Sequence, residues 1–128
     1  ALVAAADYQV TFRENMEPVG NWKELVRTFM EQPEIRIVKK TKKNEKEVDI
    51  KPYIYDMHVS EEGIFLQLAA GSVKNTKPEL VLEAFYGFCK KPFDSFALKI
   101  HRLEVYADKG EENTRHLISL ENLGEELE

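Results

Sequence analysis

Residues 63–91 read GIFLQLAAGSVKNTKPELVLEAFYGFCKK, and this stretch decides the fold. Residues 64–70 alternate with a period of two and carry apolar groups on both faces, which predicts an inner strand covered at least in part on each side. Residues 76–79, TKPE, match a capping box at a helix start. Apolar residues then recur at helical spacing over 81–88, and Pro92 prevents continuation. The stretch therefore predicts a strand, a polar turn and an amphipathic helix.

The turn inside this stretch carries groups that bind anions. Backbone amides, hydroxyls and cations at a helix N-terminus favour negative charge. The candidates are Ser72, Lys74, Asn75, Thr76 and Lys77. A well-capped loop explains the same residues, because the Glu79 carboxylate would occupy those amides with Thr76 as N-cap. The spacing is not that of a Walker sequence. Both a structural cap and a phosphate-contacting loop remain open.

Outward from this unit, the pattern predicts one further helix and four further strands. The helix spans 21–31, with Asn21 as its cap; the strands span 8–12, 35–39, 48–59 and 96–106. The order β-α-β-β-β-α-β has one strand more than the split βαβ arrangement of ferredoxin-like folds. We therefore predict an α+β, ferredoxin-like domain with an antiparallel-rich sheet and two helices on one face.

Two of these strands change phase along their length. Pro52 falls inside 48–59, and proline in a sheet belongs at an edge or a bulge, so we expect a bend there. In 96–106 the phase switches at His101-Arg102, which predicts a second bulge. Polar residues gather at both places, and the candidate polar cluster is Asp49, Lys51, His58, His101 and Arg102. Asp56 shares a strand face with His58. The two could form an acid–base pair or an ordinary polar pair on the strand surface.

The segment 39–46, KKTKKNEK, is the sharpest local charge feature. Its five lysines are Lys39, Lys40, Lys42, Lys43 and Lys46, and Asn44 marks a hairpin turn. One interpretation is a solvated hairpin tip that protects a sheet edge from aggregation. The other is an arm that contacts phosphates. No aromatic residue interleaves the lysines, so base stacking is not indicated there.

Size and composition set the class of protein. A chain of 128 residues, 43% hydrophobic and 32% charged, has the ordinary composition of a globular domain with its own core. Its single cysteine, Cys89, can form neither an internal disulfide nor a cysteine-only metal site, which favours a reducing compartment. No apolar run approaches the roughly 18 residues of a membrane span, and 1–6 is too short for a secretory leader. We expect a cytoplasmic protein.

The net charge of −5 resides in the last residues of the chain. Residues 108–128 contain two basic and seven acidic side chains, whereas 1–107 contain sixteen of each. We therefore predict a single α+β domain over 1–107 and an acidic, partly disordered tail over 108–128, with a short strand at 116–120. The acidity of the whole chain says little about nucleic acid, because the tail supplies all of it.

Four phrases together resemble a known family: LVAAADYQV at 2–10, EVDIKPYIYDM at 47–57, AAGSVKNTKPELVLEAF at 69–85 and LKIHRLEVY at 98–106. They are similar to the bacterial radical-SAM-linked (radical-SAM-associated) proteins, a family of unknown function. The resemblance spans nearly 1–107. It implies a bacterial cytosolic accessory domain, fused after or encoded beside a radical-SAM enzyme, acting toward RNA or ribosomal substrates. Family members carry a further stretch before the first phrase, so the chain resembles the C-terminal part of that domain.

The resemblance supplies no active site, and the residues supply none of the familiar signatures. The cluster motif CxxxCxxC is absent, and Cys89 alone cannot hold an iron–sulfur cluster. A nucleophile elbow, a zinc spacing and a Rossmann glycine set are absent too. We expect a non-catalytic recognition domain without cofactor, which contacts RNA through 39–46 and 72–77. The alternatives are an enzyme part-site using Asp49, His58, His101 and Arg102, or a pure protein–protein interaction domain.

Overall fold

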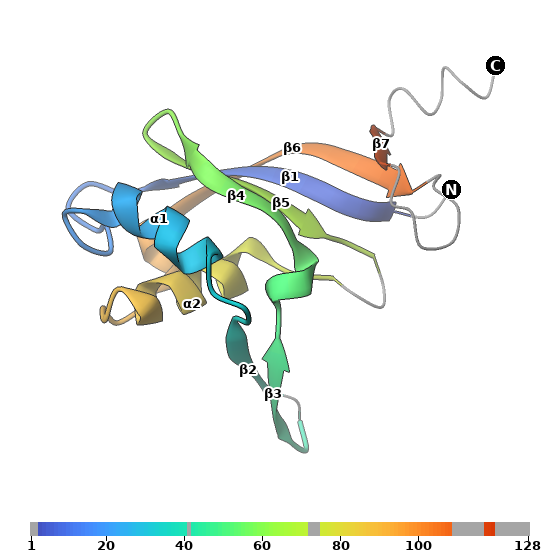
Figure 1. Ribbon diagram of the computed structural model, residues 1–128, viewed down its shortest axis with the longest axis horizontal. Helices are drawn as coiled ribbons and strands as arrows, with labels where there is room; N and C mark the ends of the chain where they lie inside the picture. The colour runs from blue at the N-terminus through green and yellow to red at the C-terminus, as the bar shows by residue number, and fades with distance from the viewer. Residues whose placement is uncertain (1–2, 41, 72–74, 109–116, 120–128) are drawn as a thin grey trace.

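The computed structural model (Figure 1) describes residues 3–40, 42–71, 75–108 and 117–119. The elements follow in chain order: β1 (Val3–Phe12), α1 (Trp22–Met30), β2 (Arg36–Lys40), β3 (Glu45–Asp49), the 3₁₀ helix η1 (Lys51–Tyr53), β4 (Ile54–Ser60), β5 (Gly63–Ala69), α2 (Pro78–Phe88), the 3₁₀ helix η2 (Ser95–Ala97), β6 (Leu98–Asp108) and β7 (Leu117–Ser119).

Five strands form one sheet in the order β4-β5-β1-β6-β7, and every neighbouring pair is antiparallel. Without the β2–β3 hairpin, the chain runs β1-α1-β4-β5-α2-β6, and its four long strands have the order of a split βαβ fold. The predicted α+β, ferredoxin-like class is therefore confirmed. The extra strand of the prediction belongs to the hairpin, which forms a sheet of its own between α1 and β4.

Both helices pack on the same face of the main sheet (Figure 1). From the sheet, Val10, Ile64 and Leu66 are fully buried, and from α2 Val81 and Phe85 are as well. Full burial of one such side chain is worth about 1.5–3 kcal/mol, so this layer holds the fold together. The helical periodicity of 81–88 and the alternation of 64–70 meet here, as the sequence predicted.

The opposite face of the main sheet, called the open face below, carries no helix in the described part of the chain (Figure 1). Strand register places one cross-strand row on it: His58 lies beside Phe65, Phe65 beside Gln9, and Gln9 beside His101. Opposite residues of an antiparallel pair point to the same side of the sheet, so these four side chains share the open face.

The predicted strand over 48–59 is two strands. Residues Lys51–Tyr53 form η1 around Pro52, so β3 turns away to pair with β2 while β4 joins the main sheet. The bend expected at Pro52 is confirmed. The second predicted bulge is confirmed as well. Tyr8 of β1 lies opposite Arg102 of β6, but its neighbour Asp7 lies opposite Glu104, so β6 has one extra residue at this point.

The start of α2 differs from the prediction. Its N-cap is Lys77, which makes no side-chain capping bond, and not Thr76. The Thr76 amide donates to the carbonyl of Ala69 at 2.9 Å and the residue is buried, so the end of β5 holds it one position before the cap. Asn21 is the N-cap of α1 as predicted, but its side chain makes no capping bond.

Part of the predicted acidic tail belongs to the sheet. β7 pairs with Tyr106–Asp108 at the end of β6, which confirms the short strand expected at 116–120. The expected partial disorder concerns mainly 109–116 and 120–128, which lie outside the described residues. The division of the chain at residue 107 stays a prediction. Within the described residues, neither helix has the length and apolar content needed to cross a membrane.

Candidate functional site

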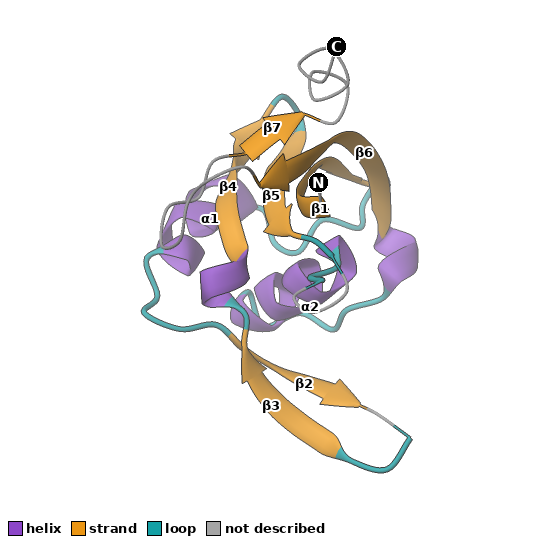
Figure 2. Cartoon of the chain, turned by 90° about the vertical axis from the view of Figure 1, so that its right-hand side faces the viewer, coloured by secondary structure: helices purple, strands orange, loops and turns teal. Residues whose placement is uncertain are grey.

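The β2–β3 hairpin extends away from the body of the molecule in both overall views (Figures 1 and 2). Lys42 and Lys43 are exposed near its tip. Behind them, Lys40 pairs with Glu45 at 3.9 Å, with 76% and 68% of the two side chains exposed. Solvent-exposed ion pairs of this kind contribute little. The positive charges at the tip therefore face solvent.

Lys39 and Lys46 lie directly opposite each other in the hairpin. Like charges in this position destabilise a strand pair. Among the described residues, neither lysine takes part in an ion pair. Over 36–49 the hairpin carries six basic and three acidic side chains, in a chain whose net charge is −5. It is a local concentration of positive charge.

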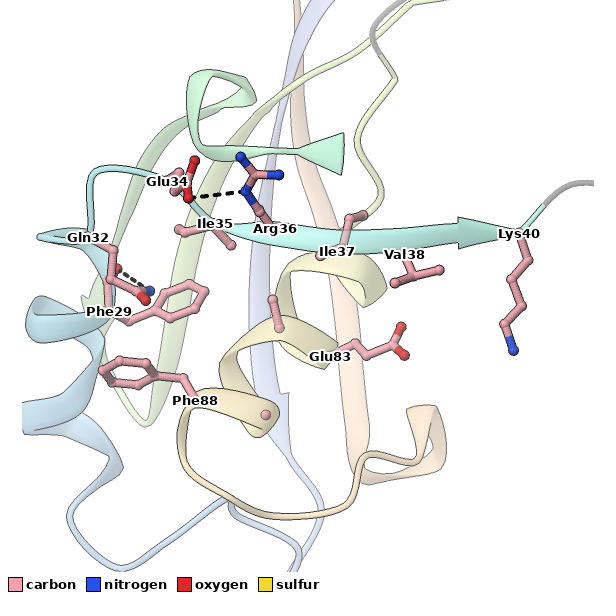
Figure 3. A pocket seen from close by; sticks show the side chains of 12 residues that line it. Phe29, Gln32, Glu34, Ile35, Arg36, Ile37, Val38, Lys40, Glu83 and Phe88 are labelled. Carbon is pink, nitrogen blue, oxygen red and sulfur yellow. Dashed lines mark hydrogen bonds and ion pairs between the residues drawn. The ribbon is translucent and has the colours of Figure 1, made fainter. Parts of the chain in front are cut away.

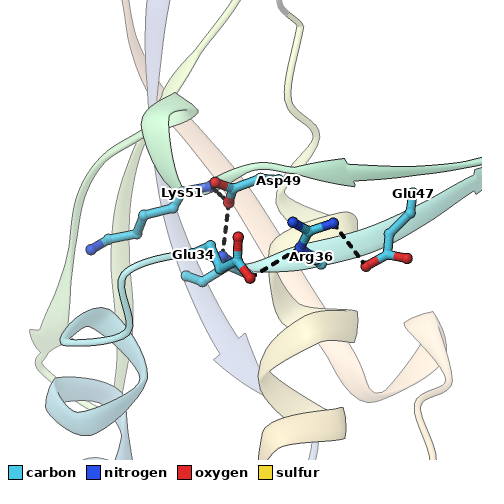
Figure 4. Close-up of polar contacts among 6 residues, drawn as sticks. Glu34, Arg36, Glu47, Asp49 and Lys51 are labelled. Carbon is cyan, nitrogen blue, oxygen red and sulfur yellow. Dashed lines mark hydrogen bonds and ion pairs between the residues drawn. The ribbon is translucent and has the colours of Figure 1, made fainter.

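The base of the hairpin is held by polar contacts, drawn in Figure 4. Asp49 Oδ1 accepts from the amide of Ile35 at 2.8 Å and from that of Lys51 at 3.0 Å. These two backbone hydrogen bonds hold the pKa of the Asp49 carboxyl below its ordinary value. Arg36 contacts Glu34 at 3.1 Å and Glu47 at 3.3 Å. The contacts fix the angle at which the hairpin leaves the body.

Lys51 has a structural role of the same kind. Its Nζ donates to the carbonyl of Met30 at 2.7 Å and to that of Gln32 at 3.1 Å, at the C-terminal end of α1. A cation there satisfies carbonyls that the helix leaves without partners and complements the helix dipole. Asp49 and Lys51 therefore anchor the hairpin to α1.

A groove of about 460 Å³ lies between β2 and α2 (Figure 3). Side chains of Val38 and Lys40 from β2 and of Glu83 from α2 point toward it. Phe88 lines it and meets Phe29 edge to face, with ring centroids 5.5 Å apart. We call this the hairpin groove. The sequence analysis missed it, because the groove exists only once β2 packs beside α2.

Gly87 of α2 also lines the hairpin groove. A Cβ added to Gly87 would meet no atom within 4 Å. Glycine inside a helix lowers stability by roughly 0.5–1 kcal/mol relative to alanine. Gly87 therefore makes α2 less stable than alanine would, and this wall of the groove has no side chain there.

The predicted anion loop is only partly described. Ser72 and Lys74 lie outside the described residues. Asn75 and Lys77 are exposed, whereas Thr76 is 2% exposed. Thr76 is therefore packed into the body, and only its two flanking residues are accessible at the surface.

The five members of the candidate polar cluster do not come together. Asp49 and Lys51 are at the hairpin base, as described above. His58 and His101 occupy the two ends of the open-face row, with Phe65 and Gln9 between them. Neighbouring strands are about 4.8 Å apart, which separates the two histidines by roughly 14 Å.

Arg102, the fifth member, lies on the other side of the sheet. It pairs with Tyr8, whose side chain packs against the core. Burial raises the pKa of the Tyr8 hydroxyl, and the nearby Arg102 charge partly opposes that rise. The four residues of the enzyme alternative therefore lie in three separate places: the hairpin base, the open face and the opposite face of the sheet.

One predicted local pair does form. His58 Nδ1 lies 3.1 Å from Asp56 Oδ2, with about half of each side chain exposed. The His58 ring also stacks on Phe65, with centroids 4.9 Å apart and planes at 28°. The pair is a surface contact supported by an aromatic ring, and no enclosed cavity surrounds it in the described pockets.

A second polar group on the open face escaped the sequence analysis. Asp7, 6% exposed, accepts from Gln67 Nε2 at 3.1 Å and from the Tyr106 hydroxyl at 2.6 Å. Burial, and after it the hydrogen bond to Asp7, raises the pKa of Tyr106 to about 12. The three residues come from three strands, so only the sheet register assembles them. Within the described residues, no three His, Cys, Asp or Glu side chains form a group that could hold a metal ion.

Comparison with known proteins places the chain in a family. Residues 1–78 match the family described as "Uncharacterized protein conserved in bacteria (DUF2344)". That description names neither a reaction nor a partner. No curated protein and no solved structure matches the chain. Because the match covers more than half of its 128 residues, the chain belongs to this uncharacterised bacterial family.

Proposed function

We propose that this chain is a recognition domain without catalytic groups of its own, which binds RNA through the β2–β3 hairpin. We further propose that it works beside a radical-SAM enzyme and holds the substrate of that enzyme. The RNA proposal rests on the hairpin. The partner proposal rests on the resemblance of 2–10, 47–57, 69–85 and 98–106 to radical-SAM-linked proteins.

The observation that supports the RNA proposal is a projecting hairpin with exposed lysines at its tip. Lys42 and Lys43 are exposed, and Lys39 faces Lys46 at a cost to the hairpin. A phosphate backbone between these charges would offset that repulsion. It would also release its condensed counterions, which is the main source of affinity in non-specific nucleic-acid binding.

The hairpin groove gives the same ligand a second contact. Its volume of about 460 Å³ lies within the range of about 300–1,000 Å³ typical of small-molecule sites. Single-stranded RNA presents unstacked bases that pack on aromatic and apolar side chains. A base entering the groove would meet Phe88 and the half-exposed Val38, while Lys40 lies beside the phosphates.

The enzyme alternative receives no comparable support. Its four residues, Asp49, His58, His101 and Arg102, are divided between the hairpin base, the two ends of the open face and the opposite side of the sheet. General acid–base chemistry requires such groups within hydrogen-bond reach of one reacting atom.

The RNA proposal predicts a loss of affinity when the hairpin tip changes sign. In fluorescence polarisation with a labelled single-stranded RNA, we expect Lys42→Glu/Lys43→Glu to bind at least about tenfold more weakly, because two phosphate contacts become repulsive. We also expect the plot of log affinity against log salt to become less steep by about one unit per lysine.

A matched control separates the hairpin from total charge. Lys23 on α1 and Lys90 beyond α2 are exposed and lie outside the hairpin. The Lys23→Glu/Lys90→Glu variant changes the net charge equally and should keep most of the affinity. Equal weakening in both double variants, or wild-type protein that binds no RNA at low salt, would refute the proposal.

The partner proposal has a test of its own. When the protein is co-expressed with a radical-SAM protein from the same bacterium, we expect the two to co-purify in a fixed ratio after nuclease treatment. Co-purification that disappears with the RNA would mean that RNA alone joins them. Failure in both conditions would remove the partner proposal and leave the RNA proposal to its separate test.

A further inference from the structure

The wall that α2 contributes to the hairpin groove has a carboxylate at one end and an aromatic ring at the other (Figure 3). Glu83 and Gly87 are four positions apart in α2, as are Ala84 and Phe88, so each pair lies on adjacent turns of the helix. Gly87 has no side chain and Ala84 has only a methyl group. A flat ring therefore has space to lie against the helix between Glu83 and Phe88.

The side-chain donors that line the groove already have partners. Gln32 Nε2 donates to a backbone carbonyl of α1 at 3.0 Å. Arg36 contacts the carboxylates of Glu34 and Glu47 at 3.1 Å and 3.3 Å. Lys40 pairs with a glutamate across the hairpin at 3.9 Å, and its charge lies beside the phosphates in the RNA complex proposed above. The groove therefore offers a bound base few donors.

Glu83 supplies the opposite kind of group. Its side chain is exposed and points toward the groove. In the part of the chain that the structure describes, its carboxylate takes part in no ion pair, whereas that of Glu34 is held by Arg36. An ionised carboxylate has two oxygens that only accept hydrogen bonds. The groove therefore suits a base that presents donors to α2.

We propose that the hairpin groove selects guanine, an inference that rests on the RNA-binding function proposed above. Of the four RNA bases, guanine alone carries two adjacent N–H donors on its Watson–Crick edge, at N1 and at the 2-amino group. The two oxygens of Glu83 accept both, in the bidentate geometry that carboxylates form with paired donors. The ring packs on Phe88 and on the apolar side chain of Val38 across the groove.

The other three bases place an acceptor against the same carboxylate. Adenine N1 and cytosine N3 lie beside their amino groups, and the single N3–H of uracil lies between two carbonyl oxygens. Two acceptors that face each other repel, so Glu83 excludes these bases as well as attracting guanine. A bidentate pair of this kind discriminates against a wrong base by about tenfold.

Single-base substitution in a short RNA tests the selection. The three probes are a labelled oligouridine, the same oligomer with one central guanosine, and the same oligomer with inosine at that place. In fluorescence polarisation we expect the guanosine oligomer to bind about tenfold more tightly than oligouridine. Inosine lacks the 2-amino group and should lose most of that gain. Because the preference comes from contacts to a base, it should persist as salt weakens the binding of all three probes.

Three variants separate the groove from the hairpin. Glu83→Gln replaces one acceptor oxygen by a donor amide and should bind the guanosine oligomer and oligouridine equally. Glu24 is exposed on α1 outside the groove, so Glu24→Gln makes the same change of charge and should keep the preference. Lys42→Glu/Lys43→Glu should bind both oligomers more weakly and keep their ratio. Circular dichroism checks that each variant is folded.

The outcomes that contradict the selection differ from those that contradict RNA binding. Equal affinity of the wild-type chain for the guanosine oligomer and oligouridine would overturn the selection and leave RNA binding in place. A guanosine preference that survives in folded Glu83→Gln, or an inosine oligomer as tight as the guanosine oligomer, would overturn the bidentate contact. Wild-type protein that binds none of the probes at low salt would refute both the selection and the proposed function.

Discussion

Asp49 connects the hairpin to the body through two backbone amides. Its carboxylate accepts from Ile35 before β2 and from Lys51 in η1, so one side chain joins the two points at which the chain enters and leaves the hairpin. A carboxylate suits this position because it accepts both bonds at once and strengthens each through its charge. Asp49, which the sequence analysis placed in the candidate polar cluster, thus positions the hairpin.

The lowered pKa of Asp49 predicts how the hairpin responds to acid. Because its folded-state pKa lies below the ordinary value of 3.8, the stabilisation is present above that pH and is lost as the pH falls through the folded-state pKa. We expect the protection of the Ile35 and Lys51 amides, measured as the ratio of intrinsic to observed exchange rate at each pH, to fall below about pH 4 in wild-type protein.

Asp49→Asn is the matched control, because its amide oxygen still accepts while its charge is gone. In this variant the protection of the two amides should be lower at neutral pH and should lose the acid-dependent step. Identical pH profiles for wild-type protein and Asp49→Asn would show that Asp49 does not carry the effect.

At the scale of one element, α2 is both a core helix and a wall of the hairpin groove. Its buried side contributes Val81, Leu82 and Phe85 to the core. Its other side leaves Glu83 and Gly87 exposed at the groove. The two sides can therefore be changed independently.

Gly87 allows that separation to be tested. Since a Cβ there meets nothing within 4 Å, Gly87→Ala should raise the free energy of unfolding by about 0.5–1 kcal/mol in urea denaturation and leave RNA affinity unchanged. Gly87→Trp should keep the fold and fill the groove, which lowers RNA affinity. Unchanged affinity in the folded tryptophan variant would exclude the groove from the RNA site and leave the lysine contacts as the remaining candidates.

At the scale of the whole molecule, the hairpin is an insertion in a ferredoxin-like body. The body closes through β1, β4, β5 and β6 with both helices on one face, and the hairpin contributes its base to the core, through Ile37 and the partly buried Val48. Folding and recognition therefore use largely separate residues.

Shortening the hairpin tests this division. Val38 and Glu47 are directly paired, so replacing residues 39–46 by Asn-Gly closes the hairpin with the turn that two-residue connections prefer. We expect the free energy of unfolding to stay within about 0.5 kcal/mol, as for surface changes in general, and RNA binding to be lost. Cooperative unfolding with retained RNA affinity would move the RNA site away from the hairpin.

The sequence by itself determined the local helices and strands and the positions at which they bend or end. The alternation of 64–70, the helical spacing of 81–88, the bend at Pro52 and the phase switch at His101 all depend on residues a few positions apart, so each can be read along the chain. Asn44, within the lysine-rich segment 39–46, likewise indicated the turn of the hairpin. These elements, in this order, sufficed for the α+β, ferredoxin-like class.

Only the tertiary structure decided which elements meet. It separated β3 from β4, moved the start of α2 to Lys77 by bonding Thr76 to β5, and dispersed the polar cluster over different surfaces. It also created the hairpin groove. The physical reason is register: which residue lies opposite which depends on pairings between strands far apart in sequence, and a shift of one residue turns every side chain to the other face.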